Sequence, residues 1–145
     1  MLIGRGHKEG RLADTEVRAF CEEALAGLRL EGKRVLALIP DATRTAPVGL
    51  MFRTLADLLA DRADRLDFLI ALGTHQPMPE AKILAMLDMD ADERHGTYDD
   101  VGIFNHAWDD ADALTTVATL SADEMDRLTD GRYAREVPVE INRRL

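Results

Sequence analysis

The sequence predicts an α/β fold, because short continuous apolar runs alternate along the chain with stretches that repeat apolar residues at helical spacing. Two such runs, residues 34–39 and 66–72, are typical of strands buried on both faces of a parallel sheet. A helical pattern follows each run, and strands joined by helices pair in parallel through right-handed crossovers. We therefore expect a Rossmann-like layered sheet, mostly parallel, with helices on both faces.

The helices are placed by their apolar spacing and by the residues at their ends. They are expected to cover residues 14–28, 48–59, 83–87 and 125–128. Asp14 is a good N-cap type for the first helix, and Pro47 suits the first turn of the second. Ser121 and Glu124 have the spacing of a capping box, which marks the start of the last helix.

Further strands are expected in the second half of the chain. They cover residues 101–104, 114–120 and 137–141. Pro138 places the last of them at an edge, because proline cannot donate to a strand ladder. Residues 88–100 are polar and are expected to form a loop. Since the sequence contains no internal repeat and no linker, residues 1–145 are expected to form a single α/β domain.

Charge and composition exclude several classes of function. The net charge of −9 argues against a nucleic-acid binder, because phosphate backbones need a basic surface. No stretch offers the ~18 consecutive apolar residues that a membrane span needs. The single cysteine, Cys21, cannot form an internal disulfide, so we expect a small core residue in a cytoplasmic protein. The chain also lacks the glycine-rich loops of classical dinucleotide and ATP sites.

Three polar clusters are expected at the carboxyl ends of strands, where open parallel sheets bind ligands. They are residues 41–44, 73–75 and 105–106. In the first cluster, Arg44 can hold a carboxylate or phosphate by two hydrogen bonds, and the amides of the next helix favour the same anion. Asp41 would orient Arg44 or accept from a ligand hydroxyl. Alternatively, Asp41 caps the turn and Arg44 makes a surface ion pair.

The second and third clusters contain histidines. His75 follows Gly73 and Thr74 on a tight turn, and a histidine suits proton transfer near neutral pH. A structural histidine bonded to the loop is the alternative. Asn105 and His106 either line the rim of a pocket or close a turn through backbone hydrogen bonds. The four histidines show no zinc spacing, so no metal ligand is expected in this chain.

Two of these clusters lie in segments with a distinctive sequence. Residues 39–47 read Ile-Pro-Asp-Ala-Thr-Arg-Thr-Ala-Pro, and residues 71–78 read Ala-Leu-Gly-Thr-His-Gln-Pro-Met. Together they resemble the N-terminal domain of the nickel-dependent lactate racemase family. Residues 63–70, 105–106 and 137–143 fit the same pattern, so the resemblance runs from about residue 35 to the C-terminus.

The resemblance implies a two-domain α/β enzyme with a nickel-pincer nucleotide, a pyridinium mononucleotide that binds nickel through carbon and sulfur. Such an enzyme takes hydride from the α-carbon of a 2-hydroxy acid, lactate by default, and returns it to the opposite face. Two histidines move the hydroxyl proton, and the resemblance makes His75 one of them. It also implies that Arg44 holds the substrate carboxylate or the cofactor phosphate. Asp41, Thr43 and Thr74 are placed in the same binding set.

The sequence also departs from that family. Relatives continue into a segment with the second catalytic histidine, the lysine that tethers the cofactor and a histidine that ligates nickel, whereas this chain ends at Leu145. Ala107 stands where many relatives carry an acidic residue, which leaves the role of His106 open. We therefore expect a truncated domain without racemase activity of its own, whose partner is the missing C-terminal portion. An unpaired edge strand at the cut would favour self-association.

Two other interpretations of the chain remain open. A stand-alone module would bind a small carboxylate or phosphate through Arg44 and the helix amides, without redox chemistry. A remnant would bind nothing through these loops.

Overall fold

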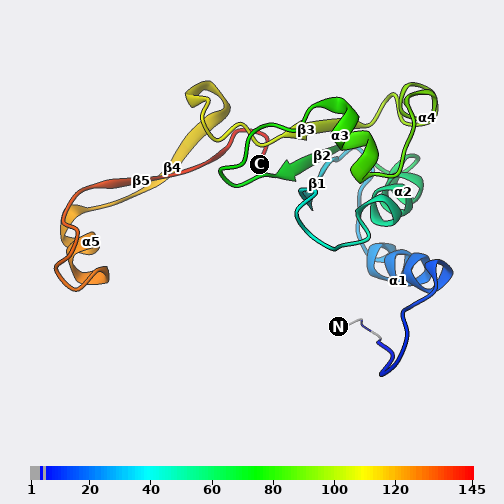
Figure 1. The fold of residues 1–145 in the computed structure, drawn as a ribbon, viewed down its shortest axis with the longest axis horizontal. Helices are drawn as coiled ribbons and strands as arrows, with labels where there is room; N and C mark the ends of the chain where they lie inside the picture. The colour runs from blue at the N-terminus through cyan, green and yellow to red at the C-terminus, as the bar shows by residue number, and fades with distance from the viewer. Residues whose placement is uncertain (1–3, 5) are drawn as a thin grey trace. The chain divides into compact units, whose positions relative to one another are not determined.

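The computed structural model describes residue 4 and residues 6–145 (Figure 1). These residues form two compact units. The larger unit contains the chain up to residue 71 together with residues 78–105, and the smaller unit contains residues 72–77 and 106–145. That residues 1–145 form a single domain stays a prediction.

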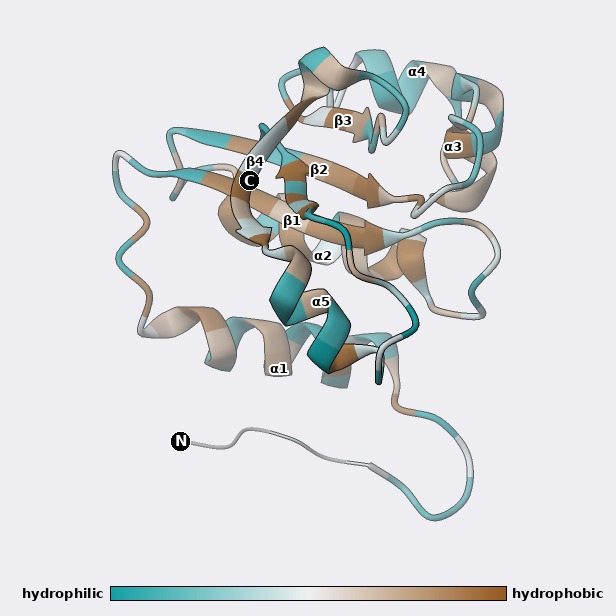
Figure 2. Cartoon of the chain, turned by 90° about the vertical axis from the view of Figure 1, so that its left-hand side faces the viewer, coloured by the Kyte–Doolittle hydropathy of each residue, from teal (hydrophilic) through white to brown (hydrophobic). Residues whose placement is uncertain are grey.

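The larger unit is built on a three-stranded parallel sheet. Its strands are β1 (Arg34–Pro40), β2 (Arg65–Ala71) and β3 (Gly102–Asn105), in the order β1-β2-β3. The register pairs Pro40 with Ala71 and Ile70 with Asn105, so the three strands end at one edge. Hydrophobic residues run along β1 and β2, as their apolar sequences predict (Figure 2). The α/β class and these three strands are confirmed.

The described part of the larger unit has four helices. They are α1 (Asp14–Ala26), α2 (Val48–Leu59), α3 (Glu80–Met86) and α4 (Ala91–His95). The first three confirm predicted helices, but Asp14 is not the N-cap residue of α1. Ala13 takes that position, and the Glu16 carboxylate accepts a hydrogen bond from its amide at 3.0 Å. Asp14 lies in the first turn, where a negative charge still favours the helix dipole.

The prediction of a loop over residues 88–100 was wrong, because α4 lies within it. Asp90 caps this short helix by accepting a hydrogen bond from the amide of Glu93 at 2.7 Å. A helix of five residues has too few positions to show an apolar period, so the sequence pattern could not reveal it. None of the described helices is long and apolar enough to cross a membrane.

The core of the larger unit lies between α2 and the sheet. Phe52 of α2 and Phe68 of β2 are fully buried, and their ring centroids are 4.6 Å apart. The ring of Tyr98 packs edge-on against Phe52 at 5.2 Å. The start of α2 lies very close to the end of α3, since a Cβ atom on Gly49 would stand 2.5 Å from the carbonyl oxygen of Leu87. Glycine is therefore required at this contact.

The smaller unit contains an antiparallel pair of strands. Its elements are the 3-10 turn η1 (Ala111–Ala113), β4 (Leu114–Leu120), α5 (Ala122–Leu128) and β5 (Val137–Asn142). The predicted capping box of α5 is confirmed: Glu124 accepts from the Ser121 amide at 2.8 Å, and the Ser121 hydroxyl accepts from the Glu124 amide at 3.3 Å. In a sheet of two strands each strand has an unpaired edge, which agrees with Pro138 in β5.

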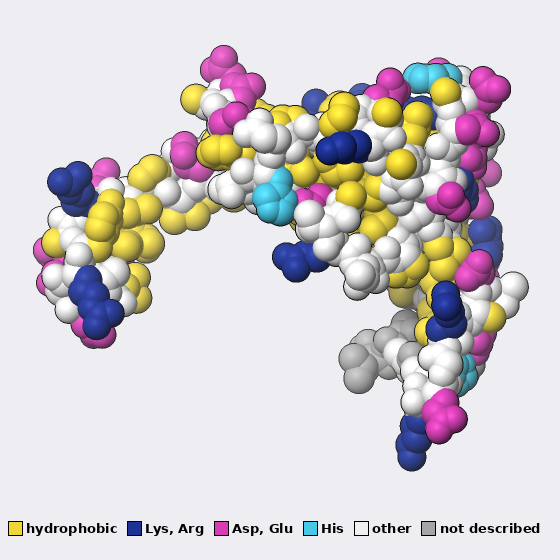
Figure 3. All heavy atoms as spheres, viewed as in Figure 1, with side chains coloured by type: hydrophobic (Ala, Val, Ile, Leu, Met, Phe, Trp, Pro, Cys, Tyr) yellow, Lys and Arg dark blue, Asp and Glu magenta, His cyan; other side chains and the backbone are white. Residues whose placement is uncertain are grey.

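The smaller unit also exposes apolar side chains on its strands, on its helix and in the loop after that helix (Figure 3). They are Val117, Leu128, Tyr133 and Val139, all more than a third exposed. A two-stranded ribbon is only marginally stable by itself in water. The sequence of this unit is therefore better suited to further packing than to full solvent exposure.

Candidate functional site

The three predicted polar clusters lie at or just after the carboxyl ends of β1, β2 and β3. Their members are divided between the two units. The larger unit contains Asp41, Thr43, Arg44 and Asn105, and the smaller unit contains Thr74, His75 and His106. Each group has its own internal geometry.

The loop after β1 is organised by Asp41. This aspartate is buried, and its Oδ1 accepts hydrogen bonds from the Thr43 amide at 3.1 Å and from the Thr43 hydroxyl at 2.5 Å. Its backbone carbonyl accepts from the Arg44 amide at 3.3 Å, which closes a turn. Asp41 therefore caps this turn, as one of the two sequence interpretations proposed. The turn sets the backbone direction at Arg44.

Arg44 itself is exposed. Among the described residues no carboxylate forms an ion pair with its guanidinium, so the alternative of a surface ion pair is not supported. The group keeps five N–H donors in a planar fork that matches a carboxylate or a phosphate. Arg44 can therefore bind an anion without first breaking a contact within the described chain.

The start of α2 adds to this preference for an anion. Pro47 is its N-cap residue, no side chain caps the first turn, and that turn contains no acidic residue. The partial positive charge at the start of a helix is usually offset by such groups. Here no such group offsets this charge, although the Val48 amide already donates to the Ala46 carbonyl at 2.8 Å. The loop and the helix start thus combine a cation with backbone donors.

His75 stands on a turn that a glycine makes possible. Gly73 has φ +60°, in the left-handed region, although a Cβ atom there would meet nothing within 4 Å. The requirement is therefore for backbone conformation and not for space. The His75 amide donates to the Leu72 carbonyl at 3.1 Å and closes the turn. Thr74 and His75 are both exposed.

Trp108 anchors the same turn. Its indole Nε1–H donates to the backbone carbonyl of His75 at 3.1 Å, while the side chain stays partly exposed. Segment 72–77 and the chain after β3 are thereby tied together within the smaller unit. Trp108 was not among the site residues predicted from the sequence. Its position two residues after His106 was the one sequence signal that pointed to the site. The local sequence does not indicate that its indole N–H donates to the His75 carbonyl.

Asn105 has a structural role in the larger unit. Its Oδ1 accepts from the Met78 amide at 3.0 Å, and its Nδ2 donates to the Met78 carbonyl at 2.9 Å. The side chain therefore imitates a strand partner for the segment that leads into α3. This finding agrees with the interpretation that Asn105 bonds to backbone, and it separates Asn105 from its neighbour His106.

His106 is held by a residue that the sequence analysis did not single out. The Asn142 side-chain amide nitrogen lies 3.2 Å from His106 Nδ1. The Asn142 Oδ1 accepts from the backbone amide of Arg144 at 3.0 Å. Asn142 is the last residue of β5 and is buried. The segment Ile-Asn-Arg at residues 141–143 is part of the family resemblance. The contact itself joins residues that are 36 positions apart, so no local pattern indicated it.

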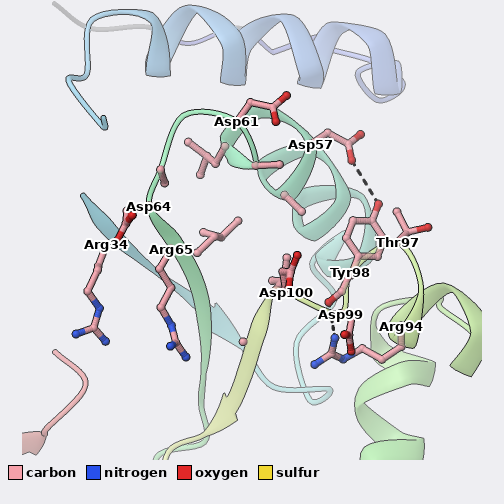
Figure 4. A pocket seen from close by; sticks show the side chains of 17 residues that line it. Arg34, Asp57, Asp61, Asp64, Arg65, Arg94, Thr97, Tyr98, Asp99 and Asp100 are labelled. Atoms are coloured by element: carbon pink, nitrogen blue, oxygen red, sulfur yellow. Dashed lines mark hydrogen bonds between the residues drawn. The ribbon is translucent and has the colours of Figure 1, made fainter. Parts of the chain in front are cut away.

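The larger unit also has an open cavity of about 1110 Å³, at the amino ends of the strands (Figure 4). Its charged lining residues are Arg34, Asp57, Asp61, Asp64, Arg65, Arg94, Asp99 and Asp100. Several of these charges are already engaged: Arg65 pairs with Asp67 at 2.9 Å, and Asp57 accepts from the Tyr98 hydroxyl at 3.4 Å. Burial, with help from Asp57, raises the pKa of Tyr98. Mixed and paired charges select no single ligand, so we favour the opposite edge as the functional one.

A metal centre is not evident in the described part of the chain. No group of three or more His, Cys, Asp or Glu residues there could hold a metal ion. The described residues do place an exposed arginine, Arg44, before an uncapped helix start in the larger unit, and two anchored histidines, His75 and His106, in the smaller one.

Comparisons with known proteins identify the family of the chain and a similar fold. The family model described as the lactate racemase N-terminal domain matches residues 16–144. The crystal structure of a protein from Thermotoga maritima is similar, with a TM-score of 0.76 and 26% identity over 91% of this chain. The match spans only 30% of that longer protein. A search of curated proteins found no match. On the extent of the family match, the chain belongs to the lactate racemase N-terminal domain family.

Proposed function

We propose that this chain supplies the anion-binding and proton-transfer residues of a 2-hydroxy-acid racemase or epimerase that works by hydride transfer to a nickel-pincer nucleotide. The family match supports the reaction class. One structural observation carries the assignment of residues: Arg44 is exposed and unpaired within the described chain, on a turn that Asp41 holds in shape. Lactate is the default substrate.

In this proposal Arg44 clamps the carboxylate of the 2-hydroxy acid or the phosphate of the nucleotide. A bidentate contact fixes the α-carbon relative to the hydride acceptor, and such positioning accounts for much of the rate of a reaction between two bound groups. Asp41 and Thr43 preserve the turn. Their contribution is therefore indirect, through the orientation of the Arg44 backbone. Thr74, next to His75 in the chain, is proposed to belong to the same binding set.

His75 is proposed to take the hydroxyl proton as hydride leaves the α-carbon. A hydroxyl that loses its proton in the same step stabilises the carbonyl that forms, and a histidine can accept that proton near neutral pH. His75 is proposed to return the proton when hydride comes back on its own side, and the second histidine implied by the family would do so on the opposite side. Its exposure in the described chain leaves it accessible to a small acid.

The described residues fit the phosphate of such a nucleotide better than its metal. Arg44 and the uncapped start of α2 suit a phosphate, whereas no cluster of metal-ligating side chains is found among the described residues. When bound, the nucleotide would supply the hydride acceptor. The chain by itself is therefore proposed to bind anions without racemising lactate.

Calorimetry tests the anion clamp on the 145-residue chain. Lactate and nicotinic acid mononucleotide are titrated into the wild type, Arg44→Ala and Arg34→Ala, the last a control at the exposed start of β1. We expect Arg44→Ala to weaken binding at least tenfold, since a hydrogen bond to a charged group contributes about 1.5–3 kcal/mol. Equal affinities in all three proteins, or no heat with either ligand, would contradict the clamp.

Racemisation is tested in the full-length gene product after it has been loaded with cofactor, and not in the 145-residue chain. Chiral chromatography follows D-lactate formed from L-lactate in the wild type, in His75→Ala and in His95→Ala, whose histidine lies exposed on α4. We expect only His75→Ala to abolish activity, with an unchanged circular dichroism spectrum. Activity that survives in His75→Ala would remove this residue from the mechanism. Anion binding without any racemisation in the wild type would favour a binding module instead.

A further inference from the structure

The side-chain amide of Asn142 lies between two fixed partners within the smaller unit. On one side is the backbone amide of Arg144, 3.0 Å from Oδ1, and on the other is His106 Nδ1, 3.2 Å from Nδ2. A backbone N–H can only donate, so the atom that faces it must be the amide oxygen. The NH₂ group of Asn142 therefore faces His106.

This orientation determines which nitrogen of His106 carries the proton. An NH₂ group can only donate, so Nδ1 must accept with its lone pair. A neutral imidazole has one N–H and one lone pair, and the N–H is then on Nε2. The tautomer of a histidine is commonly set in this way, by the hydrogen bond that its other nitrogen makes.

Several contacts stabilise the position of Asn142. It is 5% exposed and is paired with Leu114 at the end of the β4–β5 ladder. The Arg143 amide donates to the Ala113 carbonyl at 2.9 Å, and the Leu145 amide donates to the Asn142 carbonyl at 3.0 Å. The chain on both sides of the amide group is thus held by backbone hydrogen bonds. Asn142 cannot turn over without losing its bond to Arg144.

We propose that Asn142 is a positioning residue that holds His106 as the Nε2–H tautomer, so that His106 acts as a hydrogen-bond donor to a ligand carboxylate and not as a base. The neutral ring has no second lone pair with which to take a proton from a substrate. His106 thereby differs from His75, for which we propose proton transfer. The choice of a carboxylate as acceptor rests on the proposed function, whereas the tautomer does not.

Nitrogen-15 NMR of the imidazole rings tests the tautomer in the 145-residue chain at alkaline pH, where histidines are neutral. We expect the His106 Nδ1 signal at the position of an unprotonated nitrogen and the Nε2 signal at that of a protonated one. Asn142→Asp should reverse the pattern, because a carboxylate accepts from Nδ1–H. Asn142→Ala should give an average of both tautomers, and Glu140→Gln, on the same strand, should change nothing.

The wild-type spectrum decides the proposal even if a variant fails to fold. A protonated Nδ1, or an averaged pair of signals, would overturn it. Addition of lactate tests the donor role separately: the His106 Nε2–H signal should shift in the same titration that shifts the Arg44 side chain. A response of Arg44 alone would overturn the donor role while the proposed function stands. If neither responds, the anion site fails and the tautomer result still holds.

Discussion

Arg53 of α2 forms a bidentate ion pair with Glu93 of α4, in which Nε donates to Oε1 at 3.0 Å and Nη2 donates to Oε2 at 2.8 Å. The same guanidinium donates to the carbonyl oxygens of Leu87 and Asp88 at the end of α3. Its hydrogen bond to Glu93, with the charge of that carboxylate, raises the pKa of Arg53. One side chain thus connects three helices, and it explains why a five-residue helix is present in a region of polar sequence.

Removal of this connection should destabilise the larger unit. We expect Arg53→Ala to lower the free energy of unfolding by about 1–3 kcal/mol, because it leaves two helix-end carbonyls without a partner. Native-state hydrogen exchange of the β2 amides measures this value for the larger unit specifically. Glu93→Gln, which keeps the carbonyl contacts of Arg53, should cost less. Equal losses in both variants would show that those carbonyl contacts contribute nothing.

Gly49→Ala should destabilise the chain although alanine favours helices. The added methyl carbon would lie 2.5 Å from the Leu87 carbonyl oxygen and 2.9 Å from its carbon, and both are backbone atoms that cannot turn aside. Overpacking of this kind costs about 1–3 kcal/mol, more than the ~1 kcal/mol that alanine gains over glycine in a helix. The midpoint of thermal unfolding should fall. Gly27→Ala is the control, because nothing lies within 4 Å of its added carbon.

Trp108→Phe should loosen the turn that carries His75. Phenylalanine keeps an aromatic ring but cannot donate to the His75 carbonyl, which Trp108 now reaches at 3.1 Å. Amide exchange at residues 73–76 should therefore accelerate several-fold, while exchange in the β1 and β2 strands stays unchanged. Trp108→Leu, which removes the ring as well, should accelerate it at least as much. Unchanged protection of residues 73–76 in both variants would show that the indole is not an anchor.

The start of α5 should respond to acid. The hydrogen bonds from the Ser121 amide and hydroxyl lower the pKa of Glu124. A lowered folded pKa stabilises the helix above the usual pKa of a Glu carboxyl, ~4.3, and that stabilisation is lost as the pH falls through the folded value. An acid titration that follows the Ser121 amide proton should detect this loss. Glu124→Gln should remove the titration, and Asp123→Asn should retain it.

Much of the secondary structure could be predicted from local pattern. The apolar runs at residues 34–39 and 66–72 and the capping box at Ser121 and Glu124 all correspond to observed elements. Each of these signals lies within a few residues of the element it predicts. The Asp41 turn was one of two interpretations that the sequence left open, and the structure shows the local one, in which the aspartate bonds to the backbone two residues later.

Contacts between residues that are far apart in the sequence could not be predicted from local pattern. The hydrogen bonds of Arg53 with Glu93, of Trp108 with His75 and of Asn142 with His106 join residues that are 40, 33 and 36 positions apart. No period in the sequence encodes such a pair, because each depends on how strands and helices pack. The clusters at the strand ends could therefore be chosen from the sequence, but not the residues that hold them.

By itself the sequence determined the α/β class, the strands, most helices and the resemblance to the lactate racemase N-terminal domain, because all of these depend on residue order over short distances. Only the tertiary structure decided that α4 exists, that Trp108 donates to the His75 carbonyl, and that Asn142 faces His106. Those outcomes depend on the strand register and on helix packing, which bring donors and acceptors from separate segments to within about 3 Å.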